Sequence, residues 1–206
     1  ASFGCPFNCS YCTNRLRFGT KFRKRSCESV VKEIDFLVDK FSIKEIHFFD
    51  SVFNYDKQWA KEILSELSKR KDKLSIAFPH GLRIDCMDEE LIELFEKAGV
   101  YKVTYAIETA SENLQKIINK NLDLEKAKEI IELTSERNII VCGYFMLGFP
   151  DETEKEMKQT IEYAKNSKFD IAAFFKYSNL YEKMNKEYII DESFTKFGYF
   201  SKNDNL

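Results

Sequence analysis

The apolar positions of this chain alternate between two spacings. Short runs typical of strands are separated by longer segments in which apolar residues recur every three or four positions, as in helices with one buried face. Strands are predicted at residues 1–3, 44–50, 74–78, 101–107, 139–147 and 169–175. Helices are predicted between them, with start residues able to accept a backbone hydrogen bond at Ser26, Asp88, Asp123 and Thr153.

Strand and helix thus alternate about six times, with short connections. Parallel strands need crossover connections, so the alternation predicts an α/β fold with a parallel sheet. Six units, fewer than the eight of a complete barrel, favour a partial (β/α)6 TIM-like barrel with an open side. A doubly wound open sheet is the competing architecture, although no Gly-x-Gly-x-x-Gly follows the first strand.

Charge and length narrow the function classes. The 206 residues suffice for one sizeable domain, and 32 basic residues nearly cancel 34 acidic ones. Bulk charge therefore favours neither nucleic acid nor membrane as a partner, and no apolar run approaches the length of a membrane span. The chain begins at Ala1 with neither an initiator Met nor a signal sequence. We expect a piece of a longer cytoplasmic protein.

Three of the six cysteines lie in one short loop. Cys5, Cys9 and Cys12 follow one another at spacings of four and three, and no fourth Cys or His stands nearby to close a zinc tetrahedron. A [4Fe–4S] cluster usually takes four thiolates, so three would leave one iron open to another ligand. A zinc knuckle, or thiols that only pack or pair in disulfides, are the alternative interpretations.

Polar residues follow several of the predicted strands. Asp50, Arg83, Glu108 and the segment 148–153 each stand where a strand passes into its loop, so all would face one mouth of a barrel. Singly, Asp50 fits a turn as well, and Arg83 fits an ion pair with a neighbouring acid. Glu108 ends an apolar strand, and a buried carboxylate needs a hydrogen-bond donor, for which ribose hydroxyls are one candidate.

The cysteine loop, with an aromatic residue just before its third cysteine, resembles the signature of the radical S-adenosylmethionine (SAM) superfamily. As a set, the motifs resemble one branch of it, which contains the anaerobic magnesium-protoporphyrin monomethyl ester cyclase and the cobalamin-dependent radical SAM methyltransferases. The resemblance covers about residues 1–170. It is carried by the segments 4–12, 25–28, 45–53, 83–85, 106–111 and 145–153.

This resemblance implies roles for individual residues. Cys5, Cys9 and Cys12 would ligate a [4Fe–4S] cluster whose open iron binds SAM, and they would thus carry the catalysis. The remaining implied contacts are to SAM itself: Tyr11 beside the adenine, the segment ending at Phe49 and Asp50 at the methionine amine, Arg83 and Glu108 along the methionine carboxylate and ribose, and Phe149 at the adenine.

The resemblance also implies a function. The enzyme would cleave SAM reductively to a 5′-deoxyadenosyl radical for C–H activation of a small-molecule or natural-product substrate, with flavodoxin or ferredoxin as reductant. Methyl transfer with cobalamin, bound by a domain not in this chain, is one form of it. Residues 1–177 would be the radical SAM core, and 178–206 a tail or the start of a further domain. The alternatives are a methylthiotransferase of RNA or protein and a non-catalytic metal-binding module.

Overall fold

The computed structural model describes residues 1–178. Its main sheet has five strands in chain order, and every neighbouring pair is parallel. The strands are β3 (Glu45–His47), β4 (Ser75–Leu82), β5 (Val100–Glu108), β6 (Ile140–Leu147) and β7 (Ile171–Lys176). This sheet confirms the predicted α/β class with parallel strands.

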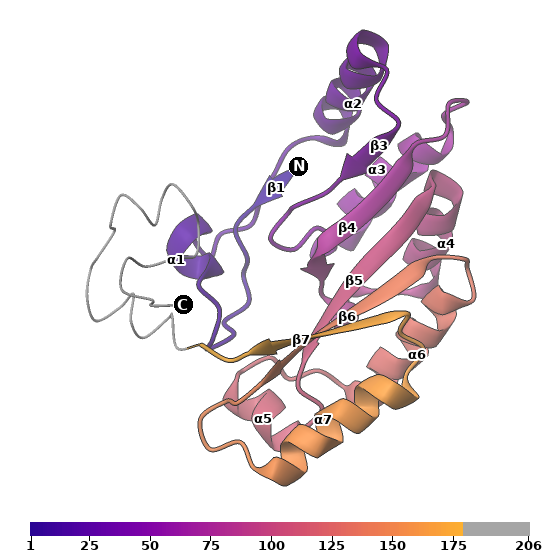
Figure 1. Cartoon of the computed structure of the whole chain (residues 1–206). Helices are drawn as coiled ribbons and strands as arrows, with labels where there is room; N and C mark the ends of the chain where they lie inside the picture. Colours follow the sequence, from indigo (N-terminus) through magenta and orange to yellow (C-terminus); the bar gives the residue numbers. More distant parts are fainter. Residues whose placement is uncertain (179–206) are drawn as a thin grey trace.

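Helices make the crossovers and cover one face of the sheet (Figure 1). They are α2 (Cys27–Phe41), α3 (Lys57–Ser68), α4 (Glu89–Ala98), α5 (Glu112–Ile117), α6 (Leu124–Ser135) and α7 (Glu154–Asn166), with a short 3₁₀ turn, η1 (Ile84–Cys86), before α4. The four predicted start residues are confirmed: each side chain accepts a backbone N–H from the first turn of its helix.

The first predicted strand does not join the parallel sheet, so the prediction of six strands in one sheet was wrong by one within residues 1–178. Instead β1 (Ser2–Phe3) pairs with β2 (Arg23–Lys24) in a separate antiparallel ribbon. The reason lies at Ser2, whose backbone N–H and hydroxyl both donate to the Asp50 carboxylate beyond β3. The Asp50 side chain therefore accepts the Ser2 backbone N–H, which would otherwise be available for strand pairing with β3.

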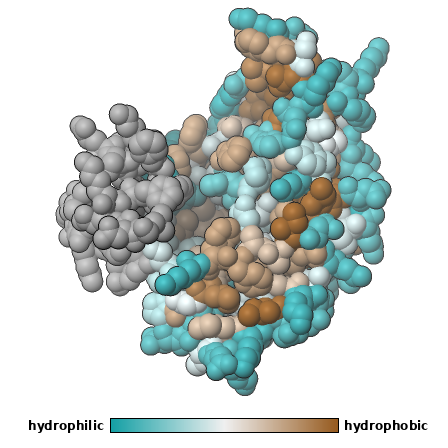
Figure 2. Space-filling view, in the orientation of Figure 1, coloured by the Kyte–Doolittle hydropathy of each residue, from teal (hydrophilic) through white to brown (hydrophobic). Residues whose placement is uncertain are grey.

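Apolar packing between the sheet and its helices forms the core. On β5, Val103, Tyr105 and Ile107 are fully buried on the helix side, and the Tyr105 hydroxyl meets Thr134 of α6 at 2.9 Å. The last strand, by contrast, is exposed, and apolar surface shows on the face seen in Figure 2. No helix within residues 1–178 has the length and apolar character that a membrane crossing requires.

The strands all deliver their carboxyl ends to one side of the molecule. In Figure 1 the arrowheads point toward the side where the N-terminal segment and the short helix α1 (Asn14–Phe18) lie. Helix α1 interrupts the basic stretch 13–24 ahead of the β2 strand. The cysteine loop between β1 and α1 is thereby placed across the strand ends that carry Glu108 and Arg83.

Candidate functional site

The cysteine loop is folded by its own backbone and tied to the loop after α5. The Cys5 N–H donates to Gly19 O at 3.2 Å, and the Ser10 N–H donates to Ile118 O at 2.9 Å. Gly4 adopts φ 82°, and a Cβ there would stand 2.1 Å from Lys21 O. Only glycine fits at that position, so the residue before the first cysteine fixes how the loop begins.

The three cysteines of the loop are all free thiols in the structure. Cysteine thiolates are the usual ligands of an iron–sulfur cluster, so this donor set fits the cluster that the resemblance implies. Burial raises the pKa of the Cys5 thiol, and raises that of Cys12 to about 11. Metal loading would therefore displace thiol protons.

Behind the cysteines, Tyr11, Glu108 and Lys120 form a buried polar triad. The Tyr11 hydroxyl and the Lys120 ammonium both donate to Glu108 Oε1, each at 2.9 Å. Glu108 is 8% exposed and Lys120 is 5% exposed. Burial, with the Glu108 charge beside it, holds the pKa of Tyr11 well above its usual range. The triad connects the cysteine loop, the end of β5 and the loop after α5.

Sequence reasoning predicted Tyr11 and Glu108 but missed Lys120. The lysine stands between Asn119 and Asn121, each at φ 55°. Asparagine is one of the few residues that tolerates this left-handed conformation, so the Asn-Lys-Asn run did indicate a sharp turn. Nothing local indicated that the turn would bring the lysine to Glu108.

Glu108 sits on an unusual backbone. Its φ is 72°, and the N–H of Thr109 bonds back to Ile107 O at 3.0 Å, which closes a three-residue turn at the end of β5. Such a conformation costs on the order of 1–3 kcal/mol and persists only where the surroundings enforce it. The Gln115 amide enforces it here, donating to Ile107 O at 3.0 Å and Thr109 O at 2.7 Å.

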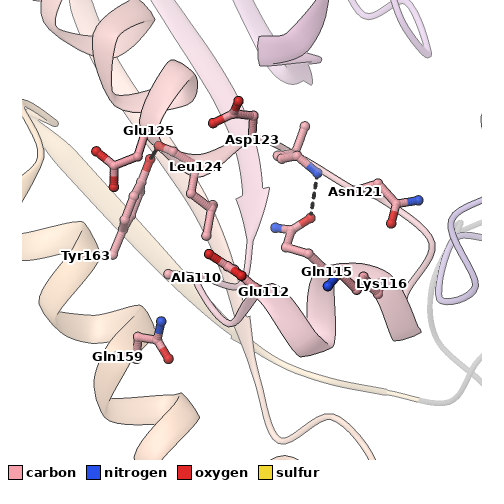
Figure 3. Close-up of a pocket in the computed structure, with 11 residues that line it drawn as sticks. Ala110, Glu112, Gln115, Lys116, Asn121, Asp123, Leu124, Glu125, Gln159 and Tyr163 are labelled. Atoms are coloured by element: carbon pink, nitrogen blue, oxygen red, sulfur yellow. Dashed lines mark hydrogen bonds between the residues drawn. The ribbon is translucent and has the colours of Figure 1, made fainter.

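Gln115 also borders a cavity of about 400 Å³ between α5, α6 and α7 (Figure 3). Its Oε1 accepts from the Leu122 N–H at 3.2 Å, the dashed contact in that figure. The amide is thus occupied on both sides by backbone. The cavity is also lined by Glu112, Asp123, Glu125 and Tyr163, and none of the predicted site residues lines it.

Arg83 contacts both the cysteine loop and the backbone of Lys120. Its guanidinium forms a two-pronged ion pair with Asp85, at 2.8 and 2.7 Å, and donates to Lys120 O at 3.0 Å. Another N–H points at Cys9 Sγ, 3.7 Å away, and the group stacks 3.7 Å from the centre of the Phe7 ring. The ion pair with a neighbouring acid, one of the two interpretations of Arg83, is what the structure contains.

Aromatic rings pack against Tyr11 of the triad. Phe149, after β6, is 5% exposed and lies edge-on to Tyr11, with ring centres 6.2 Å apart. The turn that carries it is held by Glu152, whose Oε2 accepts the N–H groups of Gly148 and Phe149 at 2.5 and 3.1 Å. Of the predicted residues, the structure thus gathers Tyr11, Glu108, Phe149 and Arg83 around the cysteine loop.

Two predicted residues lie apart from this group. Asp50 is buried, but its carboxylate is bonded to Ser2. Phe49 is 66% exposed, and its ring lies 6.2 Å from that of His47 and 6.4 Å from that of His80. A role at SAM for these two stays a prediction.

The parallel sheet with a cysteine loop across its strand ends defines the chain as an α/β barrel-type protein with a site of three thiols. A family model for the radical SAM superfamily matches residues 1–164. The chain belongs to that superfamily. The resemblance drawn from the motifs is confirmed, and the superfamily is one that uses a [4Fe–4S] cluster and SAM.

Individual relatives fall in the expected branch. The cytidylyl-2-hydroxyethylphosphonate methyltransferase of Streptomyces wedmorensis is 34% identical, covering 84% of this chain and 34% of the relative. The anaerobic magnesium-protoporphyrin IX monomethyl ester cyclase of Rubrivivax gelatinosus is 29% identical over 85% of this chain and 31% of the relative. The chain thus spans about a third of the length of these relatives.

One further relative and one solved structure complete the comparison. The ribosomal protein uS12 methylthiotransferase of Thermosipho melanesiensis is 30% identical over 86% of this chain and 43% of the relative. The radical SAM methyltransferase TsrM from Kitasatospora setae, solved with cobalamin and a [4Fe–4S] cluster, matches with a TM-score of 0.78. At 23% identity over 87% of this chain and 35% of that one, it shows a shared fold.

Proposed function

We propose that residues 1–177 are the radical SAM core of a larger enzyme, in which Cys5, Cys9 and Cys12 hold the [4Fe–4S] cluster. The observation that carries this is the placement of the cysteine loop across the carboxyl ends of the parallel strands, against Glu108 and Phe149. Parallel barrels bind their reacting groups at that end. The segment 178–206 is a tail or the start of a further domain and, from residue 179, lies outside the described residues.

The cluster, when bound, supplies the electron that splits SAM into methionine and a 5′-deoxyadenosyl radical, which takes hydrogen from the substrate. The chain's part is to position SAM and exclude water. Tyr11 and Phe149 would border the adenine, and Glu108 the ribose, with its charge balanced by Lys120. The segment ending at Phe49 and Asp50 would meet the methionine amine.

The reaction we favour is methyl transfer or a cyclase-like oxidation of a small-molecule or natural-product substrate. The named methyltransferase and cyclase relatives support this class. Cobalamin would be bound by a domain outside this chain, an assignment that rests on the cobalamin-bound structure with the same fold. A flavodoxin or ferredoxin in the cytoplasm would supply the electron.

Methylthio transfer to RNA or protein is the second candidate, because the uS12 methylthiotransferase is comparably similar to this chain. The two are separated by product: incubation of the full-length protein with SAM labelled in its methyl group transfers the label as methyl in one case and as methylthio in the other. A non-catalytic metal-binding module predicts metal without SAM affinity, which calorimetry with SAM would reveal.

The proposal is tested by anaerobic reconstitution with iron and sulfide. We expect a broad visible absorption that reduction bleaches, and deoxyadenosine once SAM is added. Cys9→Ala should abolish both, because it removes the buried thiol of the loop. Cys27→Ala, a cysteine on α2 outside the loop, is the matched control and should behave like the unaltered protein. One tightly held zinc without acid-labile sulfide would contradict the proposal, as would full iron in the Cys9→Ala variant.

A further inference from the structure

Arg83 has its N–H groups committed to several partners. The Nε and one Nη2 hydrogen hold Asp85, and Nη2 also donates to Lys120 O. Nη1 is the nitrogen that faces the cysteine loop, and the atom it faces is Cys9 Sγ. A carboxylate ligand that sought a two-pronged contact would have to displace Asp85 from the Nε–Nη2 edge, or both Lys120 O and Cys9 Sγ from the Nη1–Nη2 edge.

The backbone of the arginine is also held in place. Asn54, which is fully buried, donates its amide N–H to the backbone Arg83 O at 2.6 Å and accepts the backbone Arg83 N–H at 3.2 Å. The Phe7 ring, which belongs to the cysteine loop, covers the guanidinium face. Arg83 is 8% exposed. Its charge and its N–H direction are therefore set by the fold before any ligand arrives.

We propose that Arg83 is a positioning residue for the cluster, donating an N–H to the Cys9 sulfur, with Asp85 as its clamp, and is not the ligand of the SAM carboxylate. The inference rests on the proposed function, since it presumes that Cys9 binds the cluster. Hydrogen bonds and positive charge at cluster sulfurs stabilise the reduced state, whose negative charge is larger. Arg83 thus holds the reduction potential of the cluster above the value it would have without the arginine.

The test measures the midpoint potential by redox titration, followed by electron paramagnetic resonance, in the reconstituted full-length protein. Arg83→Gln removes the charge and Arg83→Lys keeps it without the planar fork. We expect the Gln variant to retain its iron and sulfide. Its equilibrium between oxidised and reduced cluster should shift at least tenfold toward the oxidised form, which lowers the midpoint potential by about 59 mV for one electron. The Lys variant should fall between. Arg137→Gln, whose guanidinium faces Glu89 and Glu96 on the helix side, is the control and should leave the potential unchanged.

The dissociation constant of SAM, measured in parallel by calorimetry on the loaded protein, separates the two roles. A role at the SAM carboxylate predicts weakened SAM binding with an unchanged potential, and this result would overturn the inference. Loss of the cluster from both variants while their far-UV circular dichroism stays native would also overturn it, leaving Arg83 a structural part of the loop. If the unaltered protein forms no cluster, the proposed function itself fails, a distinct outcome.

Discussion

At the scale of single residues, Lys120 has a large role for a side chain with no motif around it. Its ammonium pairs with Glu108 where the side chains are 4% and 10% exposed. Two charges out of water are tolerated there because each cancels the other and Tyr11 adds a further donor. The pair joins the end of β5 to the loop after α5, and the cysteine loop packs against both segments.

Replacing Lys120 by Met should therefore be severe. It leaves the Glu108 carboxylate buried with one neutral donor, and breaking a buried pair in this way typically costs about 3–5 kcal/mol of the free energy of unfolding. Urea unfolding of the protein without metal measures it. Lys126→Met, at a side chain that is 79% exposed, is the control and should change stability by less than about 0.5 kcal/mol.

The double variant Lys120→Met with Glu108→Gln decides whether the loss comes from an uncompensated charge. It should recover part of the stability, since the amide carries no charge to bury. If the single and double variants are equally unstable, the loss belongs to packing around the lysine stem.

The same scale shows where sequence reasoning reaches its end. The spacing of Cys5, Cys9 and Cys12 is local, so the site's metal chemistry could be predicted from it. Lys120 and Gln115 bond to groups that the turn at Glu108 brings within their reach. In that turn the glutamate has φ 72°. Propensities argue against this conformation for glutamate, so no sequence rule would have predicted it.

Among the elements, α7 is linked to the neighbouring α5 through one half-buried carboxylate. Glu156 closes the predicted capping box with Thr153, and its Oε1 accepts from the Ser111 hydroxyl at 2.7 Å. The Thr153 backbone N–H and these hydroxyls bind the ionised form, which lowers the pKa of Glu156 from 4.5 to about 2. The starts of α7 and α5 therefore share one carboxylate, each through a different oxygen.

A pH dependence follows from that shift. Because the pKa is lower in the folded chain, the contribution of Glu156 is complete above about pH 4.5 and is lost as the pH falls toward about 2. Glu156→Gln should lower stability at pH 6 and flatten the decline between those values. Denaturant unfolding from pH 2 to 6 measures both. Glu154→Gln, on the same turn with a side chain that is 81% exposed, should keep the original slope.

Element boundaries could be predicted where the period was long and regular. The helix starts at Ser26, Asp88, Asp123 and Thr153 were correct because a cap is chemistry within four residues. β1 was assigned to the parallel sheet wrongly, because two residues carry no periodicity. In the structure Ser2 bonds to the side chain of the distant Asp50, and β1 pairs with β2. β4 runs to Leu82, past the predicted end at residue 78, through an irregular register that no apolar pattern marks.

At the scale of the whole molecule, the described residues 1–178 divide into a sheet with its helices and an N-terminal loop laid across the strand ends. The first part is held by a continuous apolar core, whereas the loop is held by a small separate cluster around Phe149 and Ile118 and by a few polar contacts. These include Ser10 N–H to Ile118 O and the Asn119 amide to Asn8 O, both at 2.9 Å. Few buried apolar contacts and exposed hydrogen bonds are the features of segments that open locally at low free energy.

Cluster loading should therefore protect the loop and leave the sheet unchanged. Hydrogen exchange of the protein with and without its cluster measures this, because a ligand that binds only the closed loop lowers the open population in proportion to its affinity. We expect slower exchange in peptides covering residues 4–12 and 118–121, the latter because the loop's anchors lie there. The buried stretch 103–107 of β5 should exchange equally slowly in both forms. If that stretch too exchanges faster without the cluster, the core is not independent of the metal, and the α/β sheet would depend on its three cysteines for its own stability.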